Sequence, residues 1–417
     1  MKAITIRLKK NGLHLAACAA AIVFIADRAV AQTGQLTDDR HRAKISSARS
    51  TVPSRFGAPL LGLSADQTVS FQNGLDEFEN AETVDSGLGP TYNNVSCGAC
   101  HSLGGTGGAG TTKVTRYARL RNGAYDPMAE FGGPILHAFA TDPRAKELLP
   151  PEATIIAHRI TTPLFGAGLI EAIDDETIRL NAARPQPDGV HGVVSIVDDV
   201  STGKTRIGRF GWKAQHATLL SFAGDAYRNE MGITNRLFPT EHAPNGDLAL
   251  LKILNPHPHI EDESDPATHK SDIDRAADFI RFLAPPAATP MSESALAGAK
   301  VFSQIRCTSC HMSEMFTSPS AVSPLGNQRV ALYSDLLLHD MGALGDGIQQ
   351  GNAGQQAMRT APLWGLGVRQ HYLHDGRTTS LDKAIDAHDG EARAARDRWE
   401  ALSHAERRQL LEFLKAL

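Results

Sequence analysis

Two short motifs of cysteine and histidine carry the clearest chemistry in this sequence. They read Cys97-Gly98-Ala99-Cys100-His101 and Cys307-Thr308-Ser309-Cys310-His311. In a Cys-x-x-Cys-His motif, the two thiols bond covalently to the vinyl groups of a haem and the histidine binds the iron. The two copies use four of the five cysteines in the chain. The sequence therefore predicts two covalently bound c-type haems, with His101 and His311 as iron ligands.

Paired cysteines can also bind zinc or form a redox-active disulfide. Zinc-binding pairs usually lie about 12–20 residues apart, whereas these two pairs are separated by about 200 residues. Zinc also does not require a histidine directly after each second cysteine. A thioredoxin-like redox pair needs one C-x-x-C in a βαβ setting, which neither copy has. Both alternatives fit the sequence less well than haem does.

The first 31 residues have the pattern of a secretory signal peptide. An apolar run over 13–26 precedes the small-residue cleavage site Ala29-Val30-Ala31, so we expect the mature chain to begin at Gln32. Four basic residues come before the apolar run: Lys2, Arg7, Lys9 and Lys10. Cys18 ends a lipobox-like Leu15-Ala16-Ala17-Cys18, but it lies inside the apolar run, so no lipid anchor is expected. The pattern predicts export, most simply to a bacterial periplasm, where c-type haem is attached.

Composition limits the class of protein and its partners. The chain has 417 residues, enough for two or three domains. Its formal net charge of −4 and the lack of a basic stripe argue against nucleic acid as a partner. Every cysteine after the leader belongs to a haem motif, so no structural disulfide is expected.

The chain is predicted to be mainly α, with two cytochrome c-like haem domains. The first of them is enlarged by an insertion that contains a β-hairpin, with strands near 192–197 and 205–210. The proline-rich segment 285–290 is the best linker between the two halves, because proline stops helices and favours extended chain. The predicted parts are a signal peptide over 1–31, a flexible arm over 32–55, an N-terminal haem domain over 56–284, the linker over 285–290, and a C-terminal haem domain over 291–417.

Both halves are built on the same expected plan of helix, haem motif, loops and closing helix. Ser64 and Gln67 can form a capping box for a helix before the first motif, and Ser292 can cap a helix before the second. Closing helices are expected near 277–283 and 410–417, the latter with a capping box at Ser403 and Glu406.

Several longer segments resemble one bacterial family. These segments are Gly87-Leu88-Gly89-Pro90-Thr91-Tyr92-Asn93, Leu164 to Glu171, Gly208 to Ala214, and Ser334 to Gly342. They resemble the di-haem oxidoreductase and peroxidase family, formerly labelled thiol oxidoreductases, in the di-haem cytochrome c peroxidase superfamily. The resemblance covers about residues 55–417, and the rubber oxygenases are more distant relatives.

The resemblance implies a second ligand for the C-terminal haem. In the superfamily, a residue 14 positions after the histidine of a His-Asp-Gly turn ligates this haem. Here the turn is His374-Asp375-Gly376, and the position holds His388. The resemblance therefore implies ligation by His311 and His388, with Met341 and His339 as alternative ligands.

The N-terminal haem has no equally clear second ligand. No histidine occurs between His101 and His137, so we expect an open or weakly held position on its iron. The superfamily uses a distal glutamate for proton transfer and a tryptophan between the haems. By resemblance, Glu171 is the expected acid–base group, Arg159 the group that stabilises developing charge, and Trp212 the electron relay. The resemblance also allows for Ca²⁺ between the domains, although no acidic loop marks a site.

The predicted function is a periplasmic, peroxidase-like di-haem oxidoreductase with one electron-transfer haem and one peroxide-activating haem. A small redox protein or a quinol-linked donor would supply its electrons. Two alternatives stay open: a di-haem electron-transfer cytochrome without catalysis, and an oxygenase that uses dioxygen on an organic substrate. The sequence does not indicate the substrate, the donor or the oligomeric state.

Overall fold

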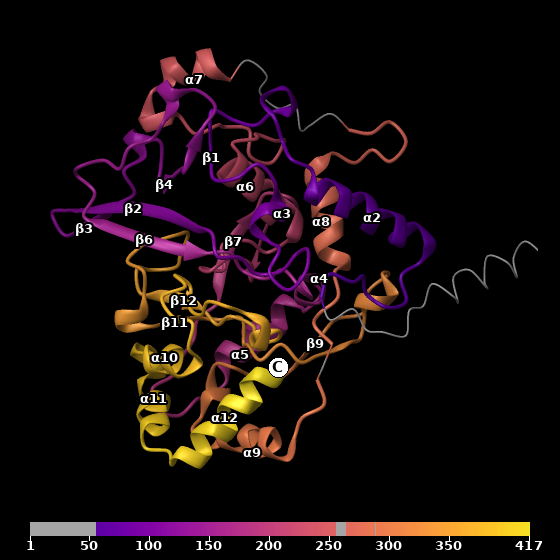
Figure 1. The fold of residues 1–417 in the computed structure, drawn as a ribbon, viewed down its shortest axis with the longest axis vertical. Helices are drawn as coiled ribbons and strands as arrows, with labels where there is room; N and C mark the ends of the chain where they lie inside the picture. The colour runs from indigo at the N-terminus through magenta and orange to yellow at the C-terminus, as the bar shows by residue number, and fades with distance from the viewer. Residues whose placement is uncertain (1–55, 256–263, 288) are drawn as a thin grey trace, which may run out of the picture. The chain divides into compact units, whose positions relative to one another are not determined.

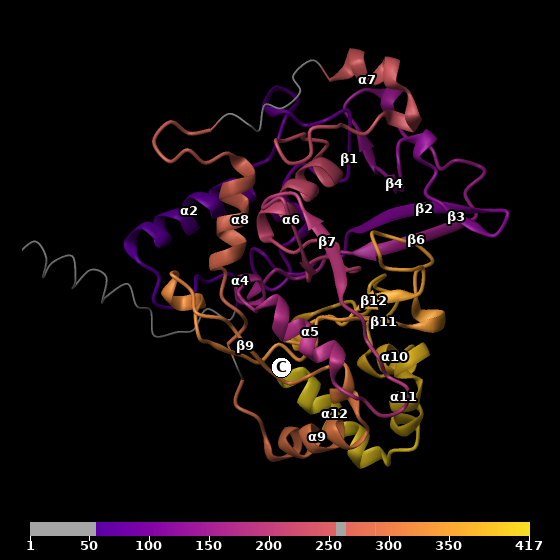
Figure 2. The same cartoon turned by 180° about the vertical axis from the view of Figure 1, so that it is seen from behind.

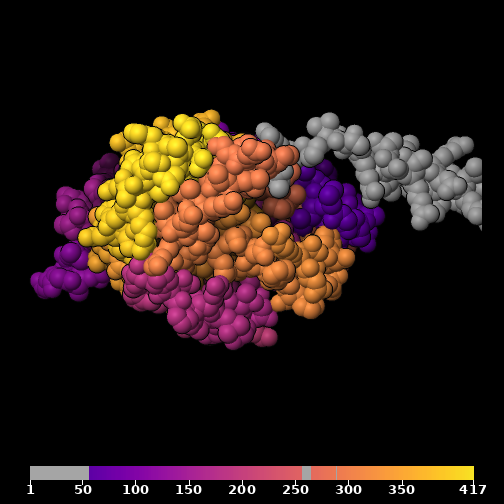
Figure 3. Space-filling view, turned by 90° about the horizontal axis from the view of Figure 1, so that it is seen from below, coloured from indigo at the N-terminus to yellow at the C-terminus, as the bar shows by residue number. Residues whose placement is uncertain are grey.

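Each haem motif lies beside a pair of packed helices from the same half of the chain. In the first half, α2 (Ala65–Glu79) packs on α8 (Asp272–Phe282). In the second half, α9 (Glu293–Gln304) packs on α12 (His404–Ala416), and Figures 1 and 3 show these two helices side by side. The predicted capping boxes begin α2 at Ser64 and α12 at Ser403, and Ser292 caps α9. The shared helical plan of the two halves is therefore confirmed.

This computed structural model describes residues 56–255, 264–287 and 289–417, which pack as one unit. The predicted signal peptide over 1–31 and the arm over 32–55 lie outside the described residues. Of the expected linker 285–290, residue 288 also lies outside, and the others form neither helix nor strand. Within the described part of the chain, no helix is both long and apolar enough to span a bilayer.

The insertion in the first half contains more sheet than predicted. The expected hairpin is confirmed as β7 (Ser195–Asp199) and β8 (Lys204–Gly208), paired antiparallel. A separate four-stranded sheet was not anticipated. Its long strand β2 (Lys113–Arg121) pairs antiparallel with β3 (Ala124–Asp126), β4 (Ile135–Leu136) and β6 (Ile155–Ile160). Figure 2 shows β2 and β6 from behind, beside the segment that holds β11 and β12.

The remaining elements are short and connect these helices and sheets. The other α-helices are α3 (Cys97–Cys100), α4 (Ala167–Glu171), α5 (Asp175–Ala183), α6 (Leu219–Ala226), α7 (Leu248–Leu254), α10 (Leu381–Asp386) and α11 (Arg393–Glu400). The π-helix η4 (Tyr227–Met231) directly continues α6. The other strands are β1 (Thr91–Tyr92), β5 (Phe139–Ala140), β9 (Met315–Phe316), β10 (Arg329–Val330), β11 (Leu338–Asp340) and β12 (Ala357–Arg359).

Two apolar clusters stabilise the helix pairs. Phe71, Phe78 and Phe279 bring α2 and α8 together in the larger cluster, with ring centroids 5.2 Å (Phe71–Phe279) and 4.7 Å (Phe78–Phe279) apart. Phe302 and Phe413 do the same for α9 and α12, with centroids 5.4 Å apart. Each cluster contacts one haem motif, so burial of these aromatic side chains also positions the motif.

Candidate haem sites and the residues between them

Each Cys-x-x-Cys-His motif lines its own large cavity. The first cavity, about 170 Å³, is lined by Cys97, Cys100 and His101. The second, about 210 Å³, is lined by Cys307, Cys310 and His311. The four cysteines are free thiols in the structure. Each motif thus presents two thiols and an imidazole to one cavity, which fits one covalently attached haem in each.

The two motif histidines are oriented alike. The His101 Nδ1 lies 3.2 Å from the Gly108 carbonyl oxygen, and the His311 Nδ1 lies 2.9 Å from that of Tyr333. A carbonyl only accepts hydrogen bonds, so each Nδ1 carries the proton, and the lone pair of the neutral ring is then on Nε2. Burial lowers the pKa of both imidazoles to about 4. Both rings are therefore neutral, the form that binds iron.

His388 faces the second cavity in a way that suits the predicted second ligand. Its Nδ1 donates to the Ala384 carbonyl oxygen at 2.8 Å, which leaves its Nε2 free. His311 lines the same cavity, and the charge on His388 is among the causes that lower the pKa of His311. The structure thus brings together the two imidazoles that the sequence proposed as a pair.

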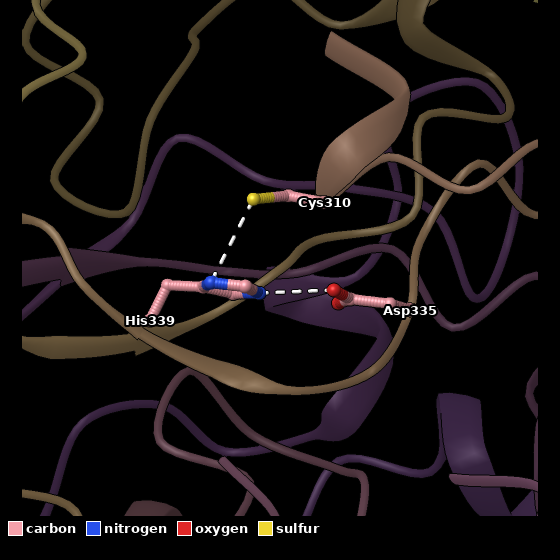
Figure 4. A group of neighbouring side chains, drawn as sticks. All are labelled: Cys310, Asp335 and His339. Carbon is pink, nitrogen blue, oxygen red and sulfur yellow. Dashed lines mark hydrogen bonds and ion pairs between the residues drawn. The ribbon is translucent and has the colours of Figure 1, made fainter. Parts of the chain in front are cut away.

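The two alternative ligands differ in their availability. His339 has both ring nitrogens engaged, with Nε2 2.9 Å from Asp335 Oδ2 and Nδ1 2.8 Å from Glu391 Oε2. Burial opposes a charge on His339, but hydrogen bonds with Asp335, Cys310 and Glu391 outweigh it and raise its pKa to about 12. Figure 4 shows His339 between Cys310 and Asp335. His339 is therefore a charged structural group, whereas Met341 lines the cavity and stays an alternative.

A carboxylate that the sequence analysis did not select faces the first cavity. Glu230, in the π-helix η4, lines this cavity together with His101. Burial raises the pKa of Glu230, while a hydrogen bond from Asn93 lowers it. The Asn93 Nδ2 donates to Glu230 Oε2 at 2.8 Å. A carboxyl group with a raised pKa beside a haem cavity is a candidate for proton exchange with a bound molecule.

Backbone contacts fix the turn that carries Glu230. The Asn93 N–H donates to the Glu230 carbonyl at 2.7 Å, and the Gly89 N–H donates to that of Met231 at 2.9 Å. A Cβ on Gly89 would lie 2.2 Å from the Gly232 carbonyl oxygen, so only glycine permits this approach. The segment before the first haem motif therefore holds η4 against the cavity. π-Helical turns of this kind are frequent at functional sites.

A buried histidine supports the same turn from the opposite side. His137 places Nε2 3.1 Å from the Asn229 carbonyl oxygen and Nδ1 2.9 Å from Glu147 Oε2. The Ala138 N–H donates to Asn93 Oδ1 at 3.1 Å, which turns the Asn93 amide so that Nδ2 points to Glu230. Residues 137 and 138 thus hold the Asn229 carbonyl, directly before Glu230, and the Asn93 amide that binds the Glu230 carboxylate.

The structure does not place Glu171, the predicted acid–base group, at either large cavity. Its Oε1 accepts the Leu219 N–H at 2.7 Å, and its Oε2 accepts the Arg281 Nε at 2.9 Å. Glu171 thereby joins the start of α6 to α8. Its carboxylate has structural partners on both oxygens, and we transfer the catalytic assignment to Glu230.

Two arginines line the first cavity, and they differ in their partners. The predicted Arg159 is tied by Nε to Asp346 at 2.7 Å and by Nη1 to Gln350 at 2.7 Å. Arg116 is also buried and lines the cavity, and no carboxylate in the described part of the chain pairs with it. Its charge lowers the pKa of Glu230. Arg116 is therefore a second cation that could stabilise negative charge near Glu230.

Trp212, the predicted relay, lines both large cavities. Its Nε1 donates to the Ile160 carbonyl at 3.0 Å, and the Ile160 N–H donates to the His374 carbonyl at 2.7 Å. Its ring meets the His374 ring edge-on, with centroids 6.2 Å apart. The sequence-based position of Trp212 between the two haem sites agrees with this geometry.

A buried ammonium lies where the two halves meet beside Trp212. The Lys213 Nζ is 3.0 Å from Asp346 Oδ1, 3.0 Å from the Gly354 carbonyl oxygen and 3.1 Å from that of Gln355. Of the described residues, only Cys310, Asp335 and His339 group at metal-ligand spacing, and Cys310 is part of the second haem motif. The Ca²⁺ prediction stays untested.

Comparison with known proteins decides the family. The family profile described as "Di-haem oxidoreductase, putative peroxidase" matches residues 140–417, about two thirds of the chain. The chain belongs to this di-haem oxidoreductase family. The matched region contains the second haem motif, Glu171, Trp212, Glu230 and His388. None of the curated proteins to which the chain was compared matches it.

Three solved structures are similar to the chain at low identity. A Kuenenia stuttgartiensis hydrazine synthase is 15% identical with a TM-score of 0.38, covering 86% of this chain and 90% of its own. A MauG-like protein associated with microbial copper homeostasis is 14% identical with a TM-score of 0.39, covering 88% and 95%. The Burkholderia thailandensis diheme peroxidase BthA is 13% identical with a TM-score of 0.38, covering 84% and 86%.

Proposed function

We propose that this di-haem oxidoreductase is an exported, periplasmic enzyme that reduces peroxide at its first haem site with electrons from its second. The observation that carries the proposal is the position of Trp212 between two cavities, of which one also contains the buried Glu230. The haems would be c-type, held through Cys97, Cys100, Cys307 and Cys310. A small redox protein or a quinol-linked donor would supply the electrons.

Three side chains of the first cavity, Glu230, Arg116 and Arg159, would take part in the reaction. When bound, haem supplies an iron that can bind peroxide and exchange single electrons. Glu230 would take a proton from one peroxide oxygen and return it to the other, which departs as water. Arg116 and Arg159 would stabilise negative charge on the departing oxygen. Glu230 ends this exchange as it began, and reduction to two waters needs two further protons and two electrons, which the remaining oxygen takes up.

The roles of the two cavities follow from their linings. Among the described residues that line the first cavity, His101 is the one histidine, which supports an accessible iron position there. The second cavity has His311 and His388 with their Nε2 atoms free, which supports two strong ligands. An iron with two strong ligands favours electron transfer over peroxide binding.

The test uses the exported, haem-loaded protein. Intact mass should exceed that of the cleaved polypeptide by two haems, and the protein should react with peroxide. Glu230→Gln should slow this reaction by about 10²–10⁴, while Glu171→Gln, the matched control, should react at nearly the parent rate. If the parent does not react with peroxide, the electron-transfer alternative replaces the proposal. If only Glu171→Gln is slow, the assignment of Glu230 is overturned.

A further inference from the structure

The second cavity is lined by four arginines, and only two of them have carboxylate partners. Arg306 pairs with Asp188 at 3.1 Å, and Arg396 pairs with Asp397 at 2.9 Å. Arg359 and Arg369 line the same cavity. In the parts of the chain that the structure describes, neither of these two guanidinium groups forms an ion pair with a carboxylate.

The side-chain hydrogen bonds of Arg359 and Arg369 end on neutral backbone carbonyls. The Arg359 Nε donates to the Gly211 carbonyl at 2.8 Å, and its Nη1 lies 3.2 Å from that of Thr360. The Arg369 Nη2 donates to the Pro362 carbonyl at 2.9 Å, and its Nε is buried without any partner. Donor groups of both side chains therefore face the cavity without an anion.

Such an arrangement is costly in the absence of a counter-ion. A buried charge without a partner costs several kcal/mol, and here two like charges also repel. Burial lowers the pKa of both arginines to about 10; for Arg359 the positive charge of Arg369 contributes to this lowering and the charge of Asp335 opposes it. The cost is offset if a doubly anionic group binds between them, because the guanidinium fork matches a carboxylate.

We propose that Arg359 and Arg369 bind the two propionate carboxylates of the haem in the second cavity. The inference rests on the haem content implied by the family and proposed above, and it does not require peroxidase activity. A haem held by Cys307 and Cys310 would bring two carboxylates into this cavity, where two guanidinium groups lack anions. The two carboxylates match the two guanidinium groups in charge, in number and in location.

The position of these arginines also links the second haem to Trp212. The Arg359 N–H donates to the Trp212 carbonyl at 2.9 Å, so backbone and side chain of Arg359 both bind the segment 211–212. Both arginines and Trp212 line a small cavity of about 40 Å³ next to the large one. The two arginines that would bind the propionates therefore line the same small cavity as Trp212, the proposed electron relay.

The test compares Arg369→Gln with Arg369→Lys and with Arg306→Gln in the haem-loaded protein. Arg306→Gln is the matched control, because it removes a cavity arginine whose partner Asp188 keeps an ion pair with Arg398. Arg369→Gln should make the midpoint potential of the second haem more negative, because the loss of a positive charge stabilises the ferric form. The potential should also become dependent on pH between about 5 and 8, since unpaired propionates take up protons more readily. Arg369→Lys should restore most of the parent potential.

A second measurement identifies the group that Arg369 contacts. The redox-induced infrared difference spectrum should show shifted propionate carboxylate bands in Arg369→Gln and unshifted bands in Arg306→Gln. An unchanged potential and pH profile in Arg369→Gln would overturn the proposal. A lower potential with unshifted carboxylate bands would also overturn it, because the charge of Arg369 would then act on the haem without contacting a propionate. If added inorganic phosphate instead shifts the parent potential and Arg369→Gln abolishes that shift, the pair binds a free anion. Arg359→Gln provides a second variant if Arg369→Gln does not load haem.

Discussion

The Asn93 side-chain amide donates a hydrogen bond to the Glu230 carboxylate at 2.8 Å, although 137 residues separate the two in sequence. The bond joins the segment before the first haem motif to the π-helix η4. A hydrogen bond to a carboxylate favours its ionised form, whereas burial favours the neutral form. Burial and this hydrogen bond are the two largest opposing effects on the pKa of Glu230, and the hydrogen bond can be removed by mutation.

Asn93→Ala should raise the pKa of Glu230, because only the lowering effect is lost. Glu230 must be ionised to accept a proton from peroxide, so the acid limb of the pH–rate profile should move to higher pH. Stopped-flow measurement of peroxide reduction from pH 4 to 9 would show this. Asn93→Gln, with the same amide on a longer chain, should shift the limb less. An identical acid limb in parent and Asn93→Ala would mean that another group titrates.

His388→Ala should change the spin state of one haem. His388 and His311 line the same cavity, and the His388 Nδ1 is the nitrogen that binds a backbone carbonyl, so loss of His388 should convert a low-spin ferric haem to high spin or to a new ligand set. Electron paramagnetic resonance of the ferric protein measures this directly. Met341→Ala is the matched control, because Met341 lines the same cavity. If Met341→Ala alone changes the low-spin signal, the ligand is Met341.

Trp212→Phe should slow electron transfer between the two haem sites while initial peroxide binding stays close to that of the parent. The indole lies against both cavities, and phenylalanine fills less of that space and lacks the N–H. Rapid mixing of the half-reduced protein with peroxide would separate the two steps. Trp364→Phe serves as control, because Trp364 is buried near the second site but lines neither large cavity. Equal rates of inter-haem electron transfer in Trp212→Phe and Trp364→Phe would show that Trp212 is not the relay.

Stability should fall with rising pH because of Glu241. Burial raises its pKa to about 8, and its Oε2 has no hydrogen-bond partner. The unfolded chain releases this proton near pH 4.5, whereas the folded protein retains it up to about pH 8. Between these values the folded state binds more protons, so its stability decreases as pH rises.

Glu241→Gln should therefore raise Tm at pH 8 more than at pH 5. Each unit of pKa displacement corresponds to about 1.4 kcal/mol, so the gain is on the order of a few kcal/mol at most. Calorimetry of the holoprotein at both pH values checks this. Glu152→Gln, at an exposed position, should leave the difference in Tm unchanged. A Tm gain for Glu241→Gln that is the same at both pH values would contradict the assignment.

The parts of the structure that were predicted correctly depend on local sequence. Capping by Ser64 and Ser403, and the turn between β7 and β8, involve residues a few positions apart. The haem motifs are local in the same way. These signals need no knowledge of distant contacts, so sequence reasoning finds them.

The parts that were missed depend on contacts between distant segments. The strand β2 has no alternating burial, because its central residues 116–118 are all buried, so period-2 patterning could not reveal it. Glu230 lies in a π-helical turn, which has no strong sequence signal. The available clue was an acidic residue that follows the apolar helix α6 and precedes Gly232. Glu171 was preferred for its resemblance to a family segment, and its partners Leu219 and Arg281 could be seen only in the folded chain.

The hydrogen bond from the Trp212 indole to the Ile160 carbonyl has a consequence for proton movement. A peptide carbonyl accepts a hydrogen bond but is far too weak a base to remove the indole proton. If Trp212 relays electrons as proposed, the N–H proton stays in place while the electron passes. The transfer between haem sites is then reversible, with a rate that is the same in H₂O and D₂O. If Glu230 exchanges protons as proposed, the electron route through Trp212 and the proton exchange use different side chains of the first cavity.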